Sequence, residues 1–152
     1  MNNTKVSVLI SNFNKQKYLE ECINSCLTQE YKNLEIIVYD NMSTDNSLNI
    51  LKSYSDKINT KVKKRVSLIA AENQTDILIE AFKISSGEII CFLDSDDYFI
   101  PRKVSVIVQK FLQNQKLKTL FDIPRIKKKE NIEPIKIKNK TNKNIWPSTI
   151  PT

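Results

Sequence analysis

The sequence predicts an α/β fold in which a parallel sheet is covered by helices on both faces. Short β-branched apolar runs alternate four times with segments whose apolar residues recur every three or four positions. Parallel strands need a crossover connection, usually a helix, so this alternation favours a parallel sheet. The 152 residues are 40% hydrophobic and 27% charged, a composition typical of one ordinary globular domain.

Four apolar runs are expected to form the strands of this sheet. They are Val6–Ile10, Leu34–Tyr39, Val66–Ala70 and Glu88–Leu93. The first and second strands end in polar residues, and the fourth ends in a cluster of aspartates. Because the carboxyl ends of parallel strands meet at one edge of the sheet, these polar groups are expected to converge there.

Each strand is followed by a predicted helix with a recognisable boundary. Asn14 is expected to cap the first helix, and Ser43 or Thr44 the second. Gly87, the only glycine, is expected in a left-handed conformation past the third helix, and Pro101 in the first turn of the fourth. The residues expected to pack these helices on the sheet are Leu19, Cys22, Ile23, Cys26, Leu27, Leu48, Leu51, Tyr54, Ile77, Leu78, Ala81, Phe82, Val104, Ile107, Val108, Phe111 and Leu112.

Charge divides the chain into two parts. Residues 1–115 hold 14 basic and 14 acidic residues, whereas residues 116–143 hold 10 basic and 3 acidic ones, so the net charge of +7 comes from the second segment. Thr119–Ile126 is a candidate fifth strand, and Lys127–Asn144 reads as a loop or disordered arm. The predicted organisation is therefore a domain of residues 1–115 followed by a basic, partly irregular tail of residues 116–152.

Composition excludes several function classes. The chain has no histidine, which removes Ser-His-Asp and Cys-His catalysis. A single glycine cannot build the glycine-rich turn of a dinucleotide-binding site or a P-loop. Cys22, Cys26 and Cys91 lie in apolar segments and are expected to be reduced core residues. Neither a signal peptide nor an apolar run long enough to span a membrane is seen, so the expected location is the cytoplasm.

The aspartates after the fourth strand are the main candidate for chemistry. Asp94, Asp96 and Asp97 lie within four residues, and their mutual repulsion is relieved by a divalent cation. Mg²⁺ and Mn²⁺ take one or two protein carboxylates and complete their coordination with phosphate and water. The pattern therefore indicates a metal-bridged diphosphate site; a solvated acidic turn is the alternative. A phosphatase of the haloacid-dehalogenase type is disfavoured, because it carries such a motif on its first strand.

Four segments together resemble the family-2 glycosyltransferases, which are inverting enzymes. The segments are Val6–Asn14, Tyr18–Gln29, Glu35–Asp45 and Gly87–Asp97, in the order and spacing of that family. The resemblance covers roughly residues 5–112. It implies the Rossmann-like glycosyltransferase A fold, with an incomplete C-terminal part.

The resemblance also implies roles for individual residues. Ser11 and Phe13 would lie at the uracil pocket of a UDP-sugar, and Asp40 would accept the hydrogen bond of the pyrimidine N–H. Asp94 would reach the ribose, and Asp96 would hold Mg²⁺ or Mn²⁺ on the diphosphate. A core role for Phe13 and a loop-capping role for Asp40 remain as alternatives.

The expected activity is transfer of a sugar from a nucleotide sugar to a glycan or lipid-linked acceptor. Such transfer needs a general base on the acceptor hydroxyl. After Asp97 the only carboxylates are Asp122, Glu130 and Glu133, none in an acidic pair, so no base is identified. The chain is expected to stop in or before the acceptor-binding half, and an inactive nucleotide-sugar-binding remnant is the alternative function.

The basic tail raises two further possibilities for partners. Residues 122–145 hold no aromatic side chain for base stacking, so specific nucleic-acid binding is not expected. Loose attraction to anionic lipid at the inner membrane face is the favoured interpretation, beside a solvated arm.

Overall fold

The computed structural model describes residues 4–56, 74–122, 125–127 and 132–134 of the chain. The chain divides into two compact units, Met1–Gln113 and Asn114–Thr152. The first unit contains, in chain order, β1 (Val6–Asn12), α1 (Gln16–Leu27), β2 (Leu34–Asp40), α2 (Ser47–Ser53), α3 (Gln74–Ile84), β3 (Ile89–Asp94) and α4 (Lys103–Gln113). The expected strand Val66–Ala70 lies outside the described residues.

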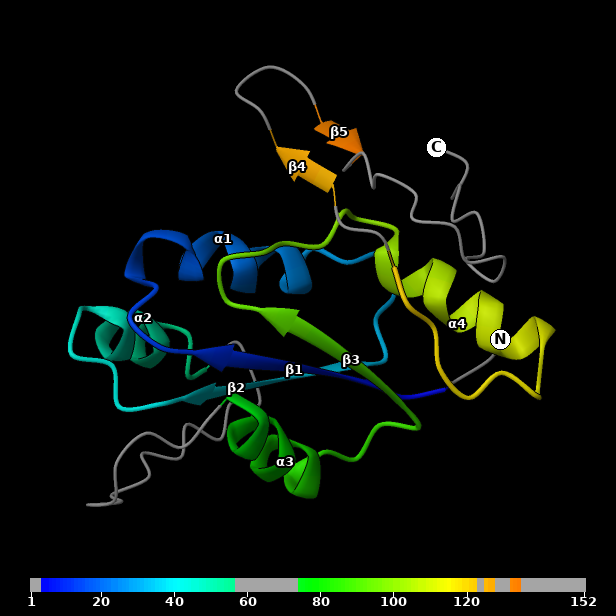
Figure 1. Ribbon diagram of the computed structural model, residues 1–152, viewed down its shortest axis with the longest axis horizontal. Coiled ribbons are helices and arrows are strands. Elements are labelled where there is room, and N and C mark those ends of the chain that lie inside the picture. The colour runs from blue at the N-terminus through cyan, green and yellow to red at the C-terminus, as the bar shows by residue number, and fades with distance from the viewer. Residues whose placement is uncertain (1–3, 57–73, 123–124, 128–131, 135–152) are drawn as a thin grey trace, which may run out of the picture. The chain divides into compact units, whose positions relative to one another are not determined.

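Strand β1 is the centre of a parallel sheet with the order β2-β1-β3. Its register pairs Val6 with Leu34 on one side and with Ile89 on the other. Figure 1 shows α1 and α2 on one side of this sheet and α3 on the other. All seven residues of β1 are buried, as expected for a strand covered on both faces. The predicted α/β fold with helices on both faces is confirmed.

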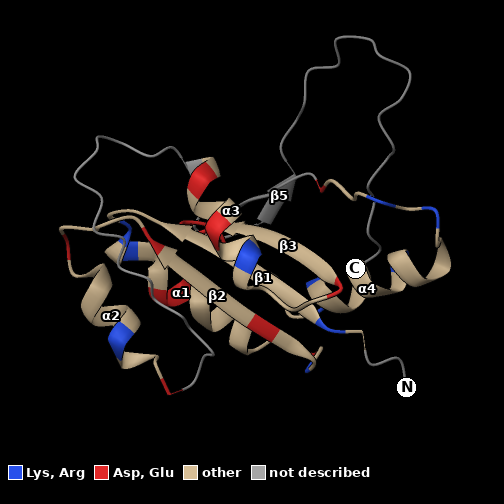
Figure 2. Cartoon of the chain, turned by 90° about the horizontal axis from the view of Figure 1, so that it is seen from below, with Lys and Arg blue, Asp and Glu red and all other residues tan. Residues whose placement is uncertain are grey.

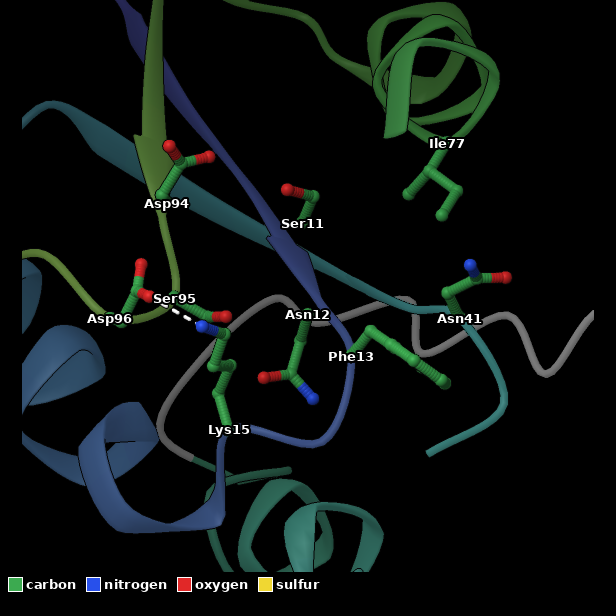
Figure 3. A pocket seen from close by; sticks show the side chains of 9 residues that line it. All are labelled: Ser11, Asn12, Phe13, Lys15, Asn41, Ile77, Asp94, Ser95 and Asp96. Carbon is green, nitrogen blue, oxygen red and sulfur yellow. Dashed lines mark hydrogen bonds and ion pairs between the residues drawn. The ribbon is translucent and has the colours of Figure 1, made fainter. Parts of the chain in front are cut away.

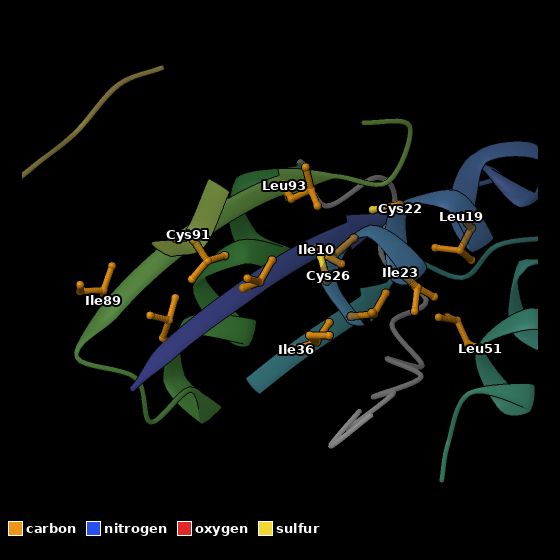
Figure 4. Close-up of a cluster of buried hydrophobic side chains, with 14 of the residues drawn as sticks. Ile10, Leu19, Cys22, Ile23, Cys26, Ile36, Leu51, Ile89, Cys91 and Leu93 are labelled. Atoms are coloured by element: carbon orange, nitrogen blue, oxygen red, sulfur yellow. The ribbon is translucent and has the colours of Figure 1, made fainter. Parts of the chain in front are cut away.

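The larger core lies between the sheet and three of the helices. Successive residues of a strand point to opposite faces, so Val6, Val8 and Ile10 all face this side. Figure 4 shows much of this cluster, in which strand residues meet Leu19 and Ile23 of α1 and Leu51 of α2. Its other buried members are Cys22, Cys26, Ile36, Val38, Ile89, Cys91, Leu93, Val104 and Val108.

The three cysteines belong to this core. All are free and buried, which confirms their expected role. Burial raises the pKa of Cys26 to about 12 and that of Cys91 to about 11. Their thiols are therefore protonated at neutral pH and poor nucleophiles.

A smaller core lies under α3. Ile77 and Ala81 of this helix pack on Leu9, Ile37 and Tyr39 of the sheet. Two residues predicted to be packed are instead exposed: Phe82 has 56% of its surface accessible, and Leu112 of α4 has 44%. Each lies at the margin of its helix's apolar stripe, where periodicity does not settle the burial of a single residue.

Two predicted helix caps are wrong. Helix α1 begins at Gln16, after Lys15 rather than Asn14, and α2 begins at Ser47, after Asn46 rather than Ser43 or Thr44. Neither N-cap residue makes a side-chain capping hydrogen bond. The polar side chains of these loops instead bond to each other, as described below for the site.

Gly87 lies three residues after the end of α3 and does not have a positive φ, so its predicted left-handed conformation is also wrong. A glycine is required there because a side chain would have no room. A Cβ atom at this position would lie 2.9 Å from the carbonyl carbon of Val6 and would collide with Ser7. Instead, the Gly87 N–H donates to Ser7 Oγ at 2.8 Å, so the chain entering β3 approaches β1 closely.

The second unit contains a short antiparallel pair, β4 (Arg125–Lys127) and β5 (Ile132–Pro134), with Ile126 opposite Glu133. The expected strand Thr119–Ile126 is therefore correct only at its end, because residues 119–122 form no strand. Part of the segment predicted as an irregular arm, Ile132–Pro134, is a strand. Strand pairing within such a lysine-rich segment is a tertiary effect that composition does not reveal.

Acidic and basic residues are interspersed along the described helices and loops of the first unit, as Figure 2 shows. This matches the equal numbers of acidic and basic residues in residues 1–115. Among the described residues, no helix combines the length and apolar character that a bilayer crossing requires.

Candidate functional site

A pocket of about 270 Å³ opens at the carboxyl ends of β1 and β3. This is the edge of a parallel α/β sheet at which ligands bind. The residues lining it are Ser11, Asn12, Phe13, Lys15, Asn41, Ile77, Asp94, Ser95 and Asp96. Four of the five predicted site residues, Ser11, Phe13, Asp94 and Asp96, are thus brought together; Asp40 is not among them.

The sheet register explains why Ser11 and Asp94 meet. The register places Ser11 of β1 opposite Asp94 of β3, and directly paired residues point to the same face. Ser11 follows Leu9 by two residues in β1, and Asp94 follows Phe92, the register partner of Leu9, by two residues in β3. Both therefore lie on the face covered by α3. Ile77 of α3 forms part of the wall there.

The pocket has two chemically different ends, which Figure 3 shows. Asp94, Asp96 and Lys15 lie toward one end, and Phe13 and Asn41 toward the other. Phe13 has 54% of its surface accessible although it is a large aromatic residue. The alternative that Phe13 is a core residue is therefore wrong. One end therefore offers an aromatic face and an amide, and the other offers charge.

Lys15 and Asp96 form an ion pair at the charged end. Lys15 Nζ lies 2.5 Å from Asp96 Oδ2. This hydrogen bond raises the pKa of Lys15 above its ordinary value, so the ammonium stays charged. Partial burial, followed by repulsion from Asp96 and Asp94, raises the pKa of the neighbouring Asp97. The carboxylates thus repel each other as the sequence predicted, and a lysine relieves part of that repulsion.

Asp40 is buried below the loop that follows β2, with 1% of its surface accessible. Its carboxylate accepts hydrogen bonds from Asn12 Nδ2 at 2.6 Å, from Ser43 N at 2.8 Å and from Ser43 Oγ at 2.7 Å. These contacts fit the loop-capping alternative. The expected contact of Asp40 with a pyrimidine stays a prediction.

Asn14 joins the two loops that border the pocket. Its Oδ1 accepts hydrogen bonds from the N–H groups of Thr44 at 2.7 Å and Asp45 at 3.3 Å, while its own N–H donates to Ser43 Oγ at 2.9 Å. Its φ of 51° is left-handed, a conformation that asparagine tolerates better than most residues. Asn14 is thus a loop cross-link and not the helix cap predicted from its position before α1.

Comparison with known proteins identifies the family of this fold and site. The family described as "Glycosyl transferase family 2" matches residues 7–151 of the chain. The chain belongs to glycosyl transferase family 2. The resemblance drawn from the four sequence segments is therefore confirmed.

Individual relatives agree with the family. The chain is 36% identical over 107 residues to an uncharacterized glycosyltransferase of Nostoc sp., which covers 70% of the chain and 33% of the relative. It is 34% identical over 112 residues to the Escherichia coli UDP-Glc:alpha-D-GlcNAc-diphosphoundecaprenol beta-1,3-glucosyltransferase WfaP, covering 74% of the chain and 43% of that protein. The chain thus spans less than half the length of these family members.

A solved glycosyltransferase structure confirms the glycosyltransferase A fold. Residues 1–349 of Staphylococcus aureus TarS, solved in complex with UDP-GlcNAc, superpose with a TM-score of 0.65 at 29% identity. The match covers 73% of the chain and 32% of the TarS structure.

The donor groups in the pocket fit a divalent cation that also binds a ligand. Within the described part of the chain, no three His, Cys, Asp or Glu side chains are close enough to hold a metal by themselves. Asp94 and Asp96 nevertheless both line the pocket, and one or two carboxylates are what Mg²⁺ takes when phosphate oxygens supply other positions. The residues present therefore fit a metal that binds together with a diphosphate.

Sequence reasoning missed Lys15 and Ser95 as lining residues. Ser95 directly follows the last residue of β3, so its position was a usable signal. Lys15 carried no such signal, because a lysine before an amphipathic helix is common on any protein surface.

Proposed function

We propose that the chain forms the donor site of a sugar transferase, binding a UDP-sugar with a divalent metal on its diphosphate. The observation that carries the proposal is the two-ended pocket, which sets an exposed aromatic ring against two carboxylates at the edge of a parallel sheet. A nucleoside diphosphate has matching ends, a flat base and a charged diphosphate.

The aromatic end suits the base and ribose. Phe13 offers its ring for stacking, and Ser11 and Asn41 offer hydrogen-bonding groups beside it. Uridine is favoured because TarS, which shares the fold at 29% identity, was solved with UDP-GlcNAc. Asp94 is the register partner of Ser11 in the sheet, a position that suits contact with the ribose.

The charged end suits the diphosphate. We assign the metal to Asp96, with Asp94 as a neighbouring carboxylate. When bound, such a cation neutralises the diphosphate as it leaves the sugar. Asp96, by binding the cation, and Asp94, by binding the ribose, orient the donor at the sheet edge.

The acceptor proposed for the transfer is a glycan or a lipid-linked sugar. The name of the Escherichia coli relative specifies a diphosphoundecaprenol-linked acceptor, which supports the lipid-linked class. Transfer also needs a general base, and both carboxylates among the residues lining the pocket are assigned to the donor. We therefore assign no base. Contact of the basic segment 116–143 with anionic lipid also stays a prediction.

The test is calorimetry of UDP binding with Mn²⁺ present or removed by a chelator. Asp96→Ala is expected to weaken binding in Mn²⁺ by roughly tenfold or more, or about 1.4 kcal/mol, and to abolish most of the metal dependence. Glu20→Ala, which removes an exposed carboxylate of α1, is the matched control and should leave binding unchanged. Equal binding by wild type and Asp96→Ala, with or without metal, would contradict the proposal.

A panel of UDP-sugars, tested for hydrolysis and for transfer to sugar acceptors, then separates binding from catalysis. UDP-sugar binding without transfer would identify the chain as a nucleotide-sugar-binding protein, the alternative derived from the sequence. Transfer would require a base that the pocket residues do not supply.

A further inference from the structure

We propose that Lys15 competes with the metal for Asp96 and, once a metal is bound there, binds the donor's diphosphate. This inference rests on the proposed function and adds one residue to the donor site. It concerns a lysine that the sequence did not single out and that lies in the loop after β1.

The ion pair places Lys15 on the residue assigned to the metal. Lys15 Nζ contacts Asp96 Oδ2 at 2.5 Å, and Figure 3 shows the lysine side chain extended toward Asp96. Lys15 is the one basic side chain among the described residues that line the pocket. It is therefore the one side chain among these residues that offsets the charge of Asp96.

A metal on Asp96 competes with this ion pair. Both cations would share one small carboxylate, and two positive charges a few ångströms apart repel each other even if each takes a different oxygen. Metal binding therefore weakens the contact between Lys15 and Asp96. It follows that Lys15 weakens binding of the metal alone.

Lys15 can leave Asp96 without disturbing the fold. Its carbonyl accepts the N–H groups of Tyr18 at 2.9 Å and Leu19 at 3.0 Å, which fixes its backbone at the start of α1. Its side chain is 42% exposed and that of Asp96 is 40% exposed. Ion pairs between such exposed groups contribute little to stability, and the four-carbon stem of lysine is flexible.

The diphosphate is the anion that the displaced ammonium would meet. It would be held at the same end of the pocket by the metal on Asp96. Lysine binds phosphate as a mobile point charge, with no need for the fixed geometry of arginine. Lys15 thus weakens binding of the metal alone and strengthens binding of the metal together with the donor. The site therefore favours binding metal and donor together.

The test uses Lys15→Met, which keeps most of the stem and removes the charge. Mn²⁺ alone, measured by the electron paramagnetic resonance signal of the free ion, should bind roughly fivefold to tenfold more tightly. UDP at saturating Mn²⁺, measured by calorimetry, should bind roughly tenfold more weakly. Lys15→Arg should retain most of the UDP affinity because it keeps the charge.

Lys17→Met is the matched control. Lys17 lies two residues away, with its Nζ 5.3 Å from the centre of the Tyr18 ring, and does not line the pocket. Both measurements should match wild type in this variant.

The two affinities must move in opposite directions. If Lys15→Met leaves either affinity unchanged, or weakens both, the role of Lys15 is overturned while wild-type UDP binding still supports the proposed function. If wild type itself binds no UDP, the proposed function fails and the role of Lys15 fails with it.

Discussion

Lys15 Nζ lies 2.5 Å from Asp96 Oδ2, and this contact joins the loop after β1 to the loop after β3 across 81 residues of sequence. The two loops meet because β1 and β3 are adjacent parallel strands that end at the same edge of the sheet. The order of the strands thus brings the positive charge of Lys15 to the negative charge of Asp96 in the pocket.

Phe13→Ala should weaken UDP binding without destabilising the protein. The ring is 54% exposed within the pocket, so its removal takes away little packing. Base–aromatic stacking contributes about 1–3 kcal/mol, which corresponds to a loss of fivefold or more in affinity. Calorimetry gives the affinity and urea denaturation the stability. Phe82→Ala, a similarly exposed aromatic on α3, is the control, and equal UDP affinity in both variants would remove Phe13 from the site.

Asp40→Asn should lower the free energy of unfolding by about 1–3 kcal/mol. The amide replaces one acceptor oxygen by a donor, which must then face a donor of Asn12 or Ser43 in a buried position. Urea denaturation measures this, with the exposed Asp56→Asn as control. UDP binding by the folded variant tests the pyrimidine contact separately: an unchanged affinity would leave Asp40 with a structural role only.

Glu35 should make stability depend on pH in the acidic range. Burial alone would raise its pKa, but hydrogen bonds from Ser7, from Ser86 and from Lys5 lower the pKa from 4.5 to about 2. Because the folded pKa lies below the unfolded one, the stabilisation is complete above about pH 4.5 and is lost as the pH falls toward 2.

Glu35→Gln measures this contribution. The variant should lose on the order of 2–3 kcal/mol at neutral pH and show a flatter stability profile between about pH 4.5 and 2. Denaturation curves across that range provide the measurement, with the exposed Glu20→Gln as control. Parallel profiles for wild type and Glu35→Gln would mean that the network leaves the carboxyl unshifted.

Met42→Gly should stabilise the protein by about 1 kcal/mol. Met42 has a φ of 58°, which is strained for a side chain other than glycine, and 44% of its surface is exposed. Glycine removes the strain with little loss of packing, although its greater freedom in the unfolded chain offsets part of the gain. Met42→Ala keeps the strained backbone and should give no gain in thermal denaturation. Equal melting temperatures for Met42→Gly and Met42→Ala would contradict the strain.

The sheet and most of its core followed from periodicity, because burial on two faces demands apolar runs such as Val6–Ile10 wherever they occur. The helix boundaries did not follow. Asn14 satisfies the composition rule for a cap equally well whether its side chain bonds to its own helix or to Thr44 across the loop. Only the tertiary fold decides between these partners.

The candidate site was likewise predictable only in part. Asp94 and Asp96 were visible because strand ends converge at one edge of the sheet, so their position alone marked them. The partner of Asp96 was not visible, since Lys15 reaches it only through the adjacency of β1 and β3. Gly87 shows the same limit, because its need for space comes from the close approach of β1.

The central position of β1 also has a consequence for how the protein is made. One flank of this strand is completed by β2 soon after it, but the other waits for β3, and the hydrogen bond from Lys5 N to Glu88 already spans 83 residues. At about 5–20 residues per second, a ribosome needs roughly 4 to 17 seconds to cover that interval. During this time one edge of β1 has unpaired backbone N–H and C=O groups and its apolar side chains are incompletely covered, so the nascent chain is a better chaperone substrate before β3 emerges than after it.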